Sequence, residues 1–181
     1  LQHELSWSYD GLGRCISQFD AMGRETRQEW DARDRLVSTT LPDGSLIKRT
    51  YAQGHDGDLP ATVSITHPSL GTNEVLLGER KYDGLGRLVW EKVGQSVSEW
   101  EYAEGEIHAH TQTLPDGTQV HTERQPELGG ALLSMQAPGV SVFNTYDPKN
   151  GRLLESRGNL GQQKDHWSPS GQLSKADYAW H

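Results

Sequence analysis

The sequence predicts an all-β protein, a meander of short antiparallel strands, and three observations support this. The hexapeptide YDGLGR occurs twice, letter for letter, at residues 9–14 and 82–87. Weaker versions of it recur at steps of 10 or 11 residues, as in FDAMGR from residue 19 and WDARDR from residue 30. The runs between them are rich in β-branched and aromatic residues, which favour strands. Turn signals at this spacing are typical of strands joined by hairpins.

Composition limits the remaining fold and function classes. Only 33% of the 181 residues are hydrophobic, and the mean hydropathy is -0.74, so we expect a thin sheet rather than one large core. The net charge is -8 with scattered basic residues, which argues against nucleic acid as a partner. No run approaches the roughly 20 apolar residues of a membrane span.

The repeats also suggest how the chain is organised. The offset that relates the two YDGLGR copies also carries LPDG at 41–44 onto LPDG at 114–117, so these segments were duplicated together. The sequence begins at Leu1 and stops in mid-pattern, and we expect a fragment of a longer protein. We predict a single repeat array over residues 1–181, with sub-repeats at about 1–73, 74–145 and 146–181.

Individual elements follow from the same signals. Expected turns lie at 10–13, 20–24, 31–34, 42–44, 83–86, 115–117 and 147–151. The clearest strand patterns are 35–41, 45–51, 62–66, 87–93, 106–114 and 140–146. No segment has convincing 3.6-residue periodicity with caps, so helix should be nearly absent, apart from a possible turn in 127–135.

The repeated motif Tyr-Asp-x-x-Gly-Arg has the chemistry of a turn. The Asp side chain can accept backbone N–H groups two residues on, and Gly adopts positive φ without steric cost. The aromatic residue packs on the sheet, and Arg begins the next strand. The predicted structural turn residues are Tyr9, Asp10, Gly13, Arg14, Phe19, Asp20, Gly23, Arg24, Tyr82, Asp83, Gly86, Arg87, Tyr146, Asp147, Gly151 and Arg152.

LPDG is a second turn signal, because Pro presets φ and Gly takes the left-handed position of a bulged hairpin. We therefore expect strands 36–41 and 45–50 to pair, and strands 108–114 and 118–123 to pair.

The Tyr-Asp-x-x-Gly-Arg-Leu ladder resembles the YD repeat of RHS-repeat proteins, which occur in bacterial polymorphic toxins, Tc toxin complexes and animal teneurins. The resemblance is clearest over 9–51, 82–102 and 146–178. It implies a ribbon of antiparallel strands coiled into a hollow shell, of which this chain is a slice. In bacterial members the shell encloses a C-terminal toxin or effector domain. The implied function is a non-catalytic structural segment whose partner is the rest of its own parent chain, secreted or at the cell surface.

The alternative function is an extracellular repeat module that binds carbohydrate or a cell surface. Trp7, Trp90 and Trp100 lie outside the turn ladder and could form a platform on which a sugar stacks. The competing interpretation is that these residues pack across strands on one face of the sheet.

An enzyme is not expected, and neither is a cofactor or a resident metal. A catalytic carboxylate pair needs two distinct environments, whereas the repeated aspartates sit in equivalent turns. His108 and His110 share a strand face, and His121 would join them only in a two-residue hairpin; the bulged hairpin that Pro115 favours places it beside Thr111. Cys15 is either a small residue after a turn or a reactive thiol.

Strands at the borders of an excised ribbon have unpaired backbone groups. Such edges pair with other chains, so we expect edge-to-edge self-association through residues near 1–9 and 172–181.

Overall fold

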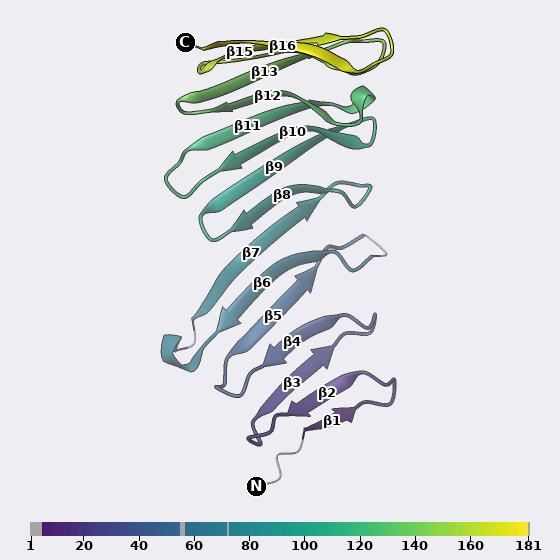
Figure 1. The fold of residues 1–181 in the computed structure, drawn as a ribbon. Coiled ribbons are helices and arrows are strands. Elements are labelled where there is room, and N and C mark those ends of the chain that lie inside the picture. The colour runs from purple at the N-terminus through teal and green to yellow at the C-terminus, as the bar shows by residue number, and fades with distance from the viewer. Residues whose placement is uncertain (1–4, 55–56, 72, 181) are drawn as a thin grey trace. The chain divides into compact units, whose positions relative to one another are not determined.

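The computed structural model describes residues 5–54, 57–71 and 73–180, so residues 1–4 and 181 of the expected border strands lie outside the described residues. In the described ranges the chain forms sixteen strands and two three-residue 3-10 helices (Figure 1). Every pairing between strands is antiparallel, and the predicted all-β fold class is confirmed. The chain forms two compact units, Leu1–Gly94 and Gln95–His181.

In the first unit each strand pairs with the next along the chain. Its elements are β1 (Ser6–Tyr9), β2 (Cys15–Phe19), β3 (Glu25–Trp30), β4 (Leu36–Thr40), β5 (Leu46–Tyr51), β6 (Pro60–Thr66), η1 (Pro68–Leu70), β7 (Glu74–Tyr82) and β8 (Leu88–Val93).

The second unit has the same sequential order. Its elements are β9 (Ser96–Ala103), β10 (Glu106–Thr113), β11 (Gln119–Gln125), η2 (Pro126–Leu128), β12 (Ala131–Ala137), β13 (Val140–Tyr146), β14 (Leu153–Gly158), β15 (Gly161–Trp167) and β16 (Leu173–Trp180).

The two LPDG hairpins form as predicted. β4 pairs with β5, and β10 pairs with β11. At the first of these turns the Gly44 N–H donates to the Leu41 carbonyl at 2.9 Å, and Gly44 has a φ of 83°. In the second hairpin His121 stands opposite Thr111, which is the bulged register that Pro115 favours.

The helical segments differ from expectation in one place. η2 occupies the start of the possible turn at 127–135, but β12 occupies most of it. Gly129 and Gly130 both have positive φ and end the 3-10 turn at once, so the following apolar residues extend as a strand. No helix in the described ranges is long and apolar enough to cross a membrane.

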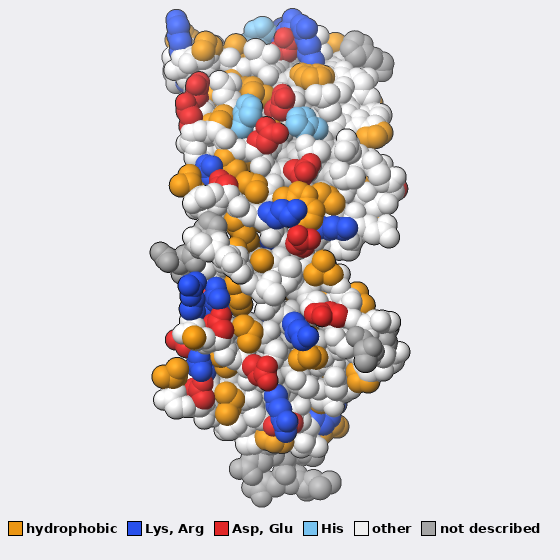
Figure 2. All heavy atoms as spheres, turned by 180° about the vertical axis from the view of Figure 1, so that it is seen from behind, with side chains coloured by type: hydrophobic (Ala, Val, Ile, Leu, Met, Phe, Trp, Pro, Cys, Tyr) orange, Lys and Arg blue, Asp and Glu red, His pale blue; other side chains and the backbone are white. Residues whose placement is uncertain are grey.

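Each unit is one layer of sheet without a hydrophobic core. Among the described residues Ala109 is the one buried hydrophobic residue, whereas Leu85 and Met22 are 78% and 75% exposed. The surface accordingly mixes hydrophobic with charged side chains (Figure 2). The backbone ladders and the contacts between neighbouring strands must therefore supply most of the stability.

Serine occupies most of the buried positions of this thin sheet. Ser17, Ser38, Ser64 and Ser134 are each at most 9% exposed. Each hydroxyl donates to a glutamate on the neighbouring strand, at 2.6 Å from Ser17 to Glu25 and at 3.1 Å from Ser134 to Glu123, with Ser38–Glu29 and Ser64–Glu74 as the other pairs. A buried hydroxyl is tolerated because it is hydrogen-bonded.

Candidate functional site

The first YDGLGR segment forms a tight turn around the Asp10 carboxylate. One carboxylate oxygen accepts the backbone N–H groups of Leu12 at 2.9 Å and Arg14 at 3.0 Å. The Gly13 N–H donates to the Asp10 carbonyl at 3.0 Å, and Gly13 has a φ of 83°. The carboxylate thus satisfies backbone donors that the reversal leaves without a strand partner.

The arginine that ends the motif closes the turn. Arg14 Nε donates to the second oxygen of Asp10 at 2.6 Å. The same bond recurs at 2.7 Å for Arg24–Asp20, 2.8 Å for Arg35–Asp31 and 2.7 Å for Arg87–Asp83. Four turns therefore share one geometry. The Asp, the residue at the Gly position and the Arg have the same role in each of them.

The fifth turn departs from this pattern because it has one inserted residue. Asn150 Nδ2 donates to Asp147 at 2.7 Å, in the place that the arginine takes elsewhere. Arg152 is released from its own turn and lies 5.4 Å above the Trp167 ring. Gly151 still has positive φ, at 71°.

These contacts keep the turn carboxylates ionised. The backbone N–H of the arginine four residues on is the largest cause that lowers the pKa of Asp10, Asp20 and Asp83 below the ordinary value. For Asp31 the Arg35 side chain is the largest cause, and its hydrogen bond lowers the pKa to about 2. The aspartates hold similar environments, which suits a repeated structural role.

The aromatic residues of the ladder tie each turn to the strand before it. Trp30, at the end of β3, donates its Nε1–H to the carbonyl of Cys15, the first residue of β2, at 2.8 Å. The same bond to the start of the preceding strand recurs four times. The acceptor is the first residue of the strand for Tyr51 to Leu36 at 2.9 Å, Tyr82 to Pro60 at 2.9 Å and Trp167 to Leu153 at 2.8 Å, and the second residue for Tyr146 to Leu132 at 2.8 Å.

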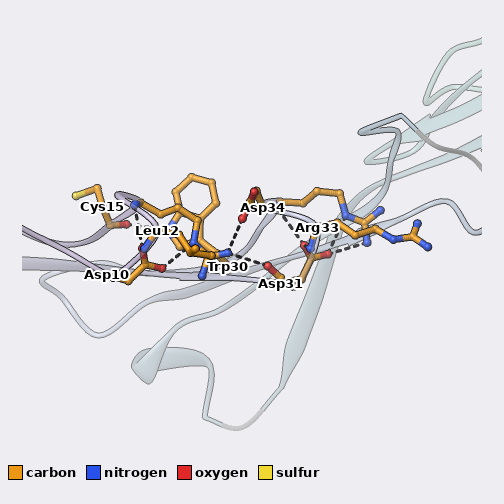
Figure 3. A network of polar contacts seen from close by, with 9 residues as sticks. Asp10, Leu12, Cys15, Trp30, Asp31, Arg33 and Asp34 are labelled. Carbon is orange, nitrogen blue, oxygen red and sulfur yellow. Dashed lines mark hydrogen bonds and ion pairs between the residues drawn. The ribbon is translucent and has the colours of Figure 1, made fainter.

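The arginines continue the connection toward the next turn at the same sheet edge. Arg14 Nη1 donates to the Asp31 carbonyl at 2.9 Å and to the Asp34 carboxylate at 2.8 Å. Arg35 lies 4.4 Å above the ring of Tyr51. Figure 3 shows the turns that contain Asp10 and Asp31 side by side, with Trp30 between them. We call this chain of turn, aromatic residue and arginine the edge column.

Asp34 is a member of the edge column that sequence reasoning missed. It takes the place of glycine in WDARDR and has a φ of 60°, which is uncommon for a residue with a side chain. Aspartate tolerates this region better than most residues, and its carboxylate receives Arg14. The signal in the sequence was the alignment of WDARDR with YDGLGR, which put Asp34 at the glycine position.

Phe19 and Asp20 belong to the opposite edge. Their turn joins β2 to β3, whereas the column turns join β1 to β2 and β3 to β4. Phe19 is 37% exposed and pairs across to Glu25. The sequence motif therefore occurs at both edges, but the column that we describe follows one of them.

Of the three tryptophans proposed as a platform, Trp7 and Trp90 lie in the same unit and do not converge. Trp7 is on β1 and Trp90 on β8, which at strand spacings of about 4.8 Å puts them roughly 30 Å apart or more. Lys81 lies 4.3 Å above the Trp90 ring, and Trp100, in the second unit, stacks on His110 with centroids 5.0 Å apart. Each has a different environment.

Each of the three histidines contacts a different partner. The His108 ring is 3.2 Å from the Arg124 carbonyl, and the His121 ring is 2.8 Å from the Thr111 hydroxyl. His110 stacks on Trp100, and burial is the largest cause that lowers its pKa. Within the described part of the chain no three His, Cys, Asp or Glu residues are grouped so that they could hold a metal ion.

Comparisons with known proteins give a family match over part of the chain and a similar fold. A family model described as RHS Repeat matches residues 9–46. The chain resembles a structure of the Photorhabdus luminescens Tc holotoxin pore with a TM-score of 0.50 and 12% identity, over 96% of this chain and 12% of that one. A TcdB2-TccC3 crystal structure gives a TM-score of 0.40 and 12% identity, over 97% and 13%. The chain thus spans about an eighth of these proteins. Among curated proteins none matches the sequence.

Proposed function

Since residues 9–46 of this chain match the RHS Repeat family model, we propose that the chain is a non-catalytic structural segment of an RHS shell that encloses a C-terminal toxin or effector domain. The observation that carries the proposal is the edge column, which links successive hairpins of a sheet one layer thick. The proposed partner is the rest of the parent chain, and the proposed location of that parent is secreted or at the cell surface.

A wall of this kind must keep its strands in register without a core behind them. In five strand pairs the column supplies a contact that does not depend on burial, an aromatic hydrogen bond to a carbonyl. Arg14, Arg35 and Arg152 add contacts to the next turn at the same edge. Buried serine–glutamate bonds take the place of apolar packing. These features suit a container wall better than a compact enzyme domain.

The non-catalytic part of the proposal is supported by the state of the aspartates. In four of the repeated turns the carboxylate accepts backbone N–H groups and an arginine side chain, and in the fifth Asp147 accepts the Lys149 N–H and the Asn150 side chain, so these carboxylates are engaged in holding the turn. A general base needs a free lone pair that can reach a substrate proton.

The test uses the full parent protein. The variant Arg35→Ala/Tyr51→Ala removes one step of the edge column, and Arg33→Ala is a matched control in the same turn, since its side chain makes no contact among those described. The double variant should expose the C-terminal domain to protease, and the control should leave it protected. If deleting residues 9–46 leaves that domain fully protected, the segment is not part of its enclosure.

A second candidate function, carbohydrate binding, is supported by a different surface from the predicted tryptophan platform. Tyr178 and Trp180 are stacked with an interplanar angle of 8° and are 60% and 80% exposed. They flank a recess of about 190 Å³ where Gly158 and Gly161 face each other. Binding of the chain to a glycan array that is lost in Trp180→Ala, and kept in Trp7→Ala, would favour this candidate; an array without signal would remove it.

A further inference from the structure

The edge column follows one register rule wherever it occurs. Continuing the β4–β5 register from Ser38 opposite Lys48 places Tyr51 opposite Arg35. The carbonyl that Tyr51 bonds belongs to the next residue, Leu36. The aromatic residue therefore always stands opposite the residue just before its acceptor, and the other column pairs that obey this rule are β2–β3, β6–β7, β12–β13 and β14–β15.

The first turn has the aromatic donor of this arrangement without an acceptor. Tyr9 is the column aromatic of β1; it is 59% exposed, and its hydroxyl has no partner within the described ranges. A side chain on Gly13 would meet nothing within 4 Å, whereas at Gly171, the same turn position, the Arg152 guanidinium fills that space.

The last turn has the acceptor position without an aromatic donor. Leu173 begins β16 just as Leu36 begins β4, and the preceding Gln172 occupies the position of Arg35. Both Gln172 and Leu173 are exposed. Across the part of the chain that is described, β16 pairs with β15 and β1 pairs with β2, so each presents one edge of unpaired backbone groups.

We propose that the chain associates head to tail, with β1 of one copy adding to the free edge of β16 of a second copy in the register of the edge column. Strand directions alternate along the order, so β1 placed after β16 is antiparallel to it. The rule sets Tyr9 opposite Gln172, Ser8 opposite Leu173 and Trp7 opposite Ser174. The Tyr9 hydroxyl then donates to the Leu173 carbonyl, and the Gln172 side chain lies over the Tyr9 ring.

This contact is heterologous, since β1 meets β16 and never itself, and therefore each added copy leaves one edge of each kind free. The net charge of -8 opposes association at low ionic strength. Salt shortens the Debye length to about 8 Å at 0.15 M, so association should rise with salt. The inference rests on the internal repeat geometry and concerns the 181-residue chain by itself, because in the proposed parent protein the strands of the parent chain would pair with the same two edges.

Two substitutions adjust the contact in opposite directions. Gln172→Arg restores the arginine that lies on the aromatic ring elsewhere in the column, and we expect association about two- to fivefold tighter, the range for an exposed cation–π contact. Tyr9→Phe removes the hydroxyl donor and should weaken association by about two- to tenfold. Gln136→Arg adds the same charge at an exposed position inside β12 and should have neither effect.

Sedimentation of the 181-residue chain at two salt concentrations measures these changes, and disulfide trapping in a Cys15→Ser background reads the register. Ser8→Cys mixed with Leu173→Cys should give covalent dimers that neither variant gives alone, and so should Trp7→Cys mixed with Ser174→Cys. Both mixtures are used because the Cα separation of directly opposite residues alternates between a shorter and a longer value along an antiparallel pair. Ser6→Cys mixed with Leu173→Cys is the control two residues out of register. A monomer at every salt concentration, or covalent dimers only within one variant, would overturn the proposal.

Discussion

The two glycines of the first YDGLGR turn offer a matched pair of substitutions. Gly11 and Gly13 lie in the same hexapeptide, and a methyl group at either would meet nothing within 4 Å. They differ in backbone conformation, because Gly13 has a φ of 83° and Gly11 lies outside the left-handed region. Replacing each by alanine therefore changes the strain of one position and leaves packing unchanged at both.

The magnitude follows from two terms. Alanine restricts the unfolded chain and stabilises by about 0.4–1 kcal/mol at either position. At Gly13 it also meets the left-handed penalty of about 1–2 kcal/mol. Gly11→Ala should thus stabilise slightly, Gly13→Ala should destabilise by up to roughly 1.5 kcal/mol, and the difference between them should be about 1–2 kcal/mol because the entropy term cancels.

The assay must report on this hairpin, since a terminal hairpin can open without global unfolding. Native-state hydrogen exchange of the β2 amides gives the local opening free energy in each variant. The pair Gly84→Ala and Gly86→Ala tests the same difference in backbone conformation in the second YDGLGR copy, where Gly86 has a φ of 78°. Equal opening free energies for Gly11→Ala and Gly13→Ala would refute the assignment of positive φ as the reason for the glycine.

Three further predictions concern the edge column. Tyr51→Phe keeps the ring but loses its bond to a strand carbonyl and should cost about 0.5–1.5 kcal/mol in urea unfolding, whereas Tyr178→Phe, whose hydroxyl has no described partner, should change stability by less than about 0.5 kcal/mol. Because the folded pKa of Asp31 is depressed to about 2, its stabilising contribution is present above its ordinary pKa of 3.8 and is lost as pH falls toward 2; unfolding free energies measured from pH 5 to 2 should show a shallower fall in Asp31→Asn. Gly171→Ala should lower the melting temperature more than alanine at the open Gly13 position, because the Arg152 guanidinium must move; equal shifts would contradict the contact.

The turns could be predicted from sequence because they depend on local chemistry. Asp followed by a correctly spaced Gly fixes a reversal through bonds within five residues, and the two LPDG hairpins paired as expected for the same reason. The register of His121 opposite Thr111 also followed from the loop, since Pro115 favours the bulged form. The sub-repeat boundaries near residues 73 and 145 stay a prediction.

What sequence reasoning missed depends on contacts between turns. The aromatic residues were expected to pack on the sheet, but their hydrogen bonds join residues such as Trp30 and Cys15, 15 positions apart, and depend on the pairing of β2 with β3. The composition indicated a thin sheet, yet no pattern marked Ser134, 3% exposed, as one of its most buried residues. The possible turn expected at 127–135 is in fact η2 followed by β12, with Gly129 and Gly130 at positive φ between them.

The sequential strand order of each unit has a consequence for how the protein is made. Every ladder within a unit joins strands that follow each other along the chain, so each pairing closes a loop of only a few residues. Low contact order of this kind favours fast folding. A hairpin can form as soon as its second strand has been synthesised, and each later strand finds its template already in place. The fold of each unit can therefore be assembled in the direction of translation. At any moment only the most recently made strand and the first strand of the unit have an unpaired edge.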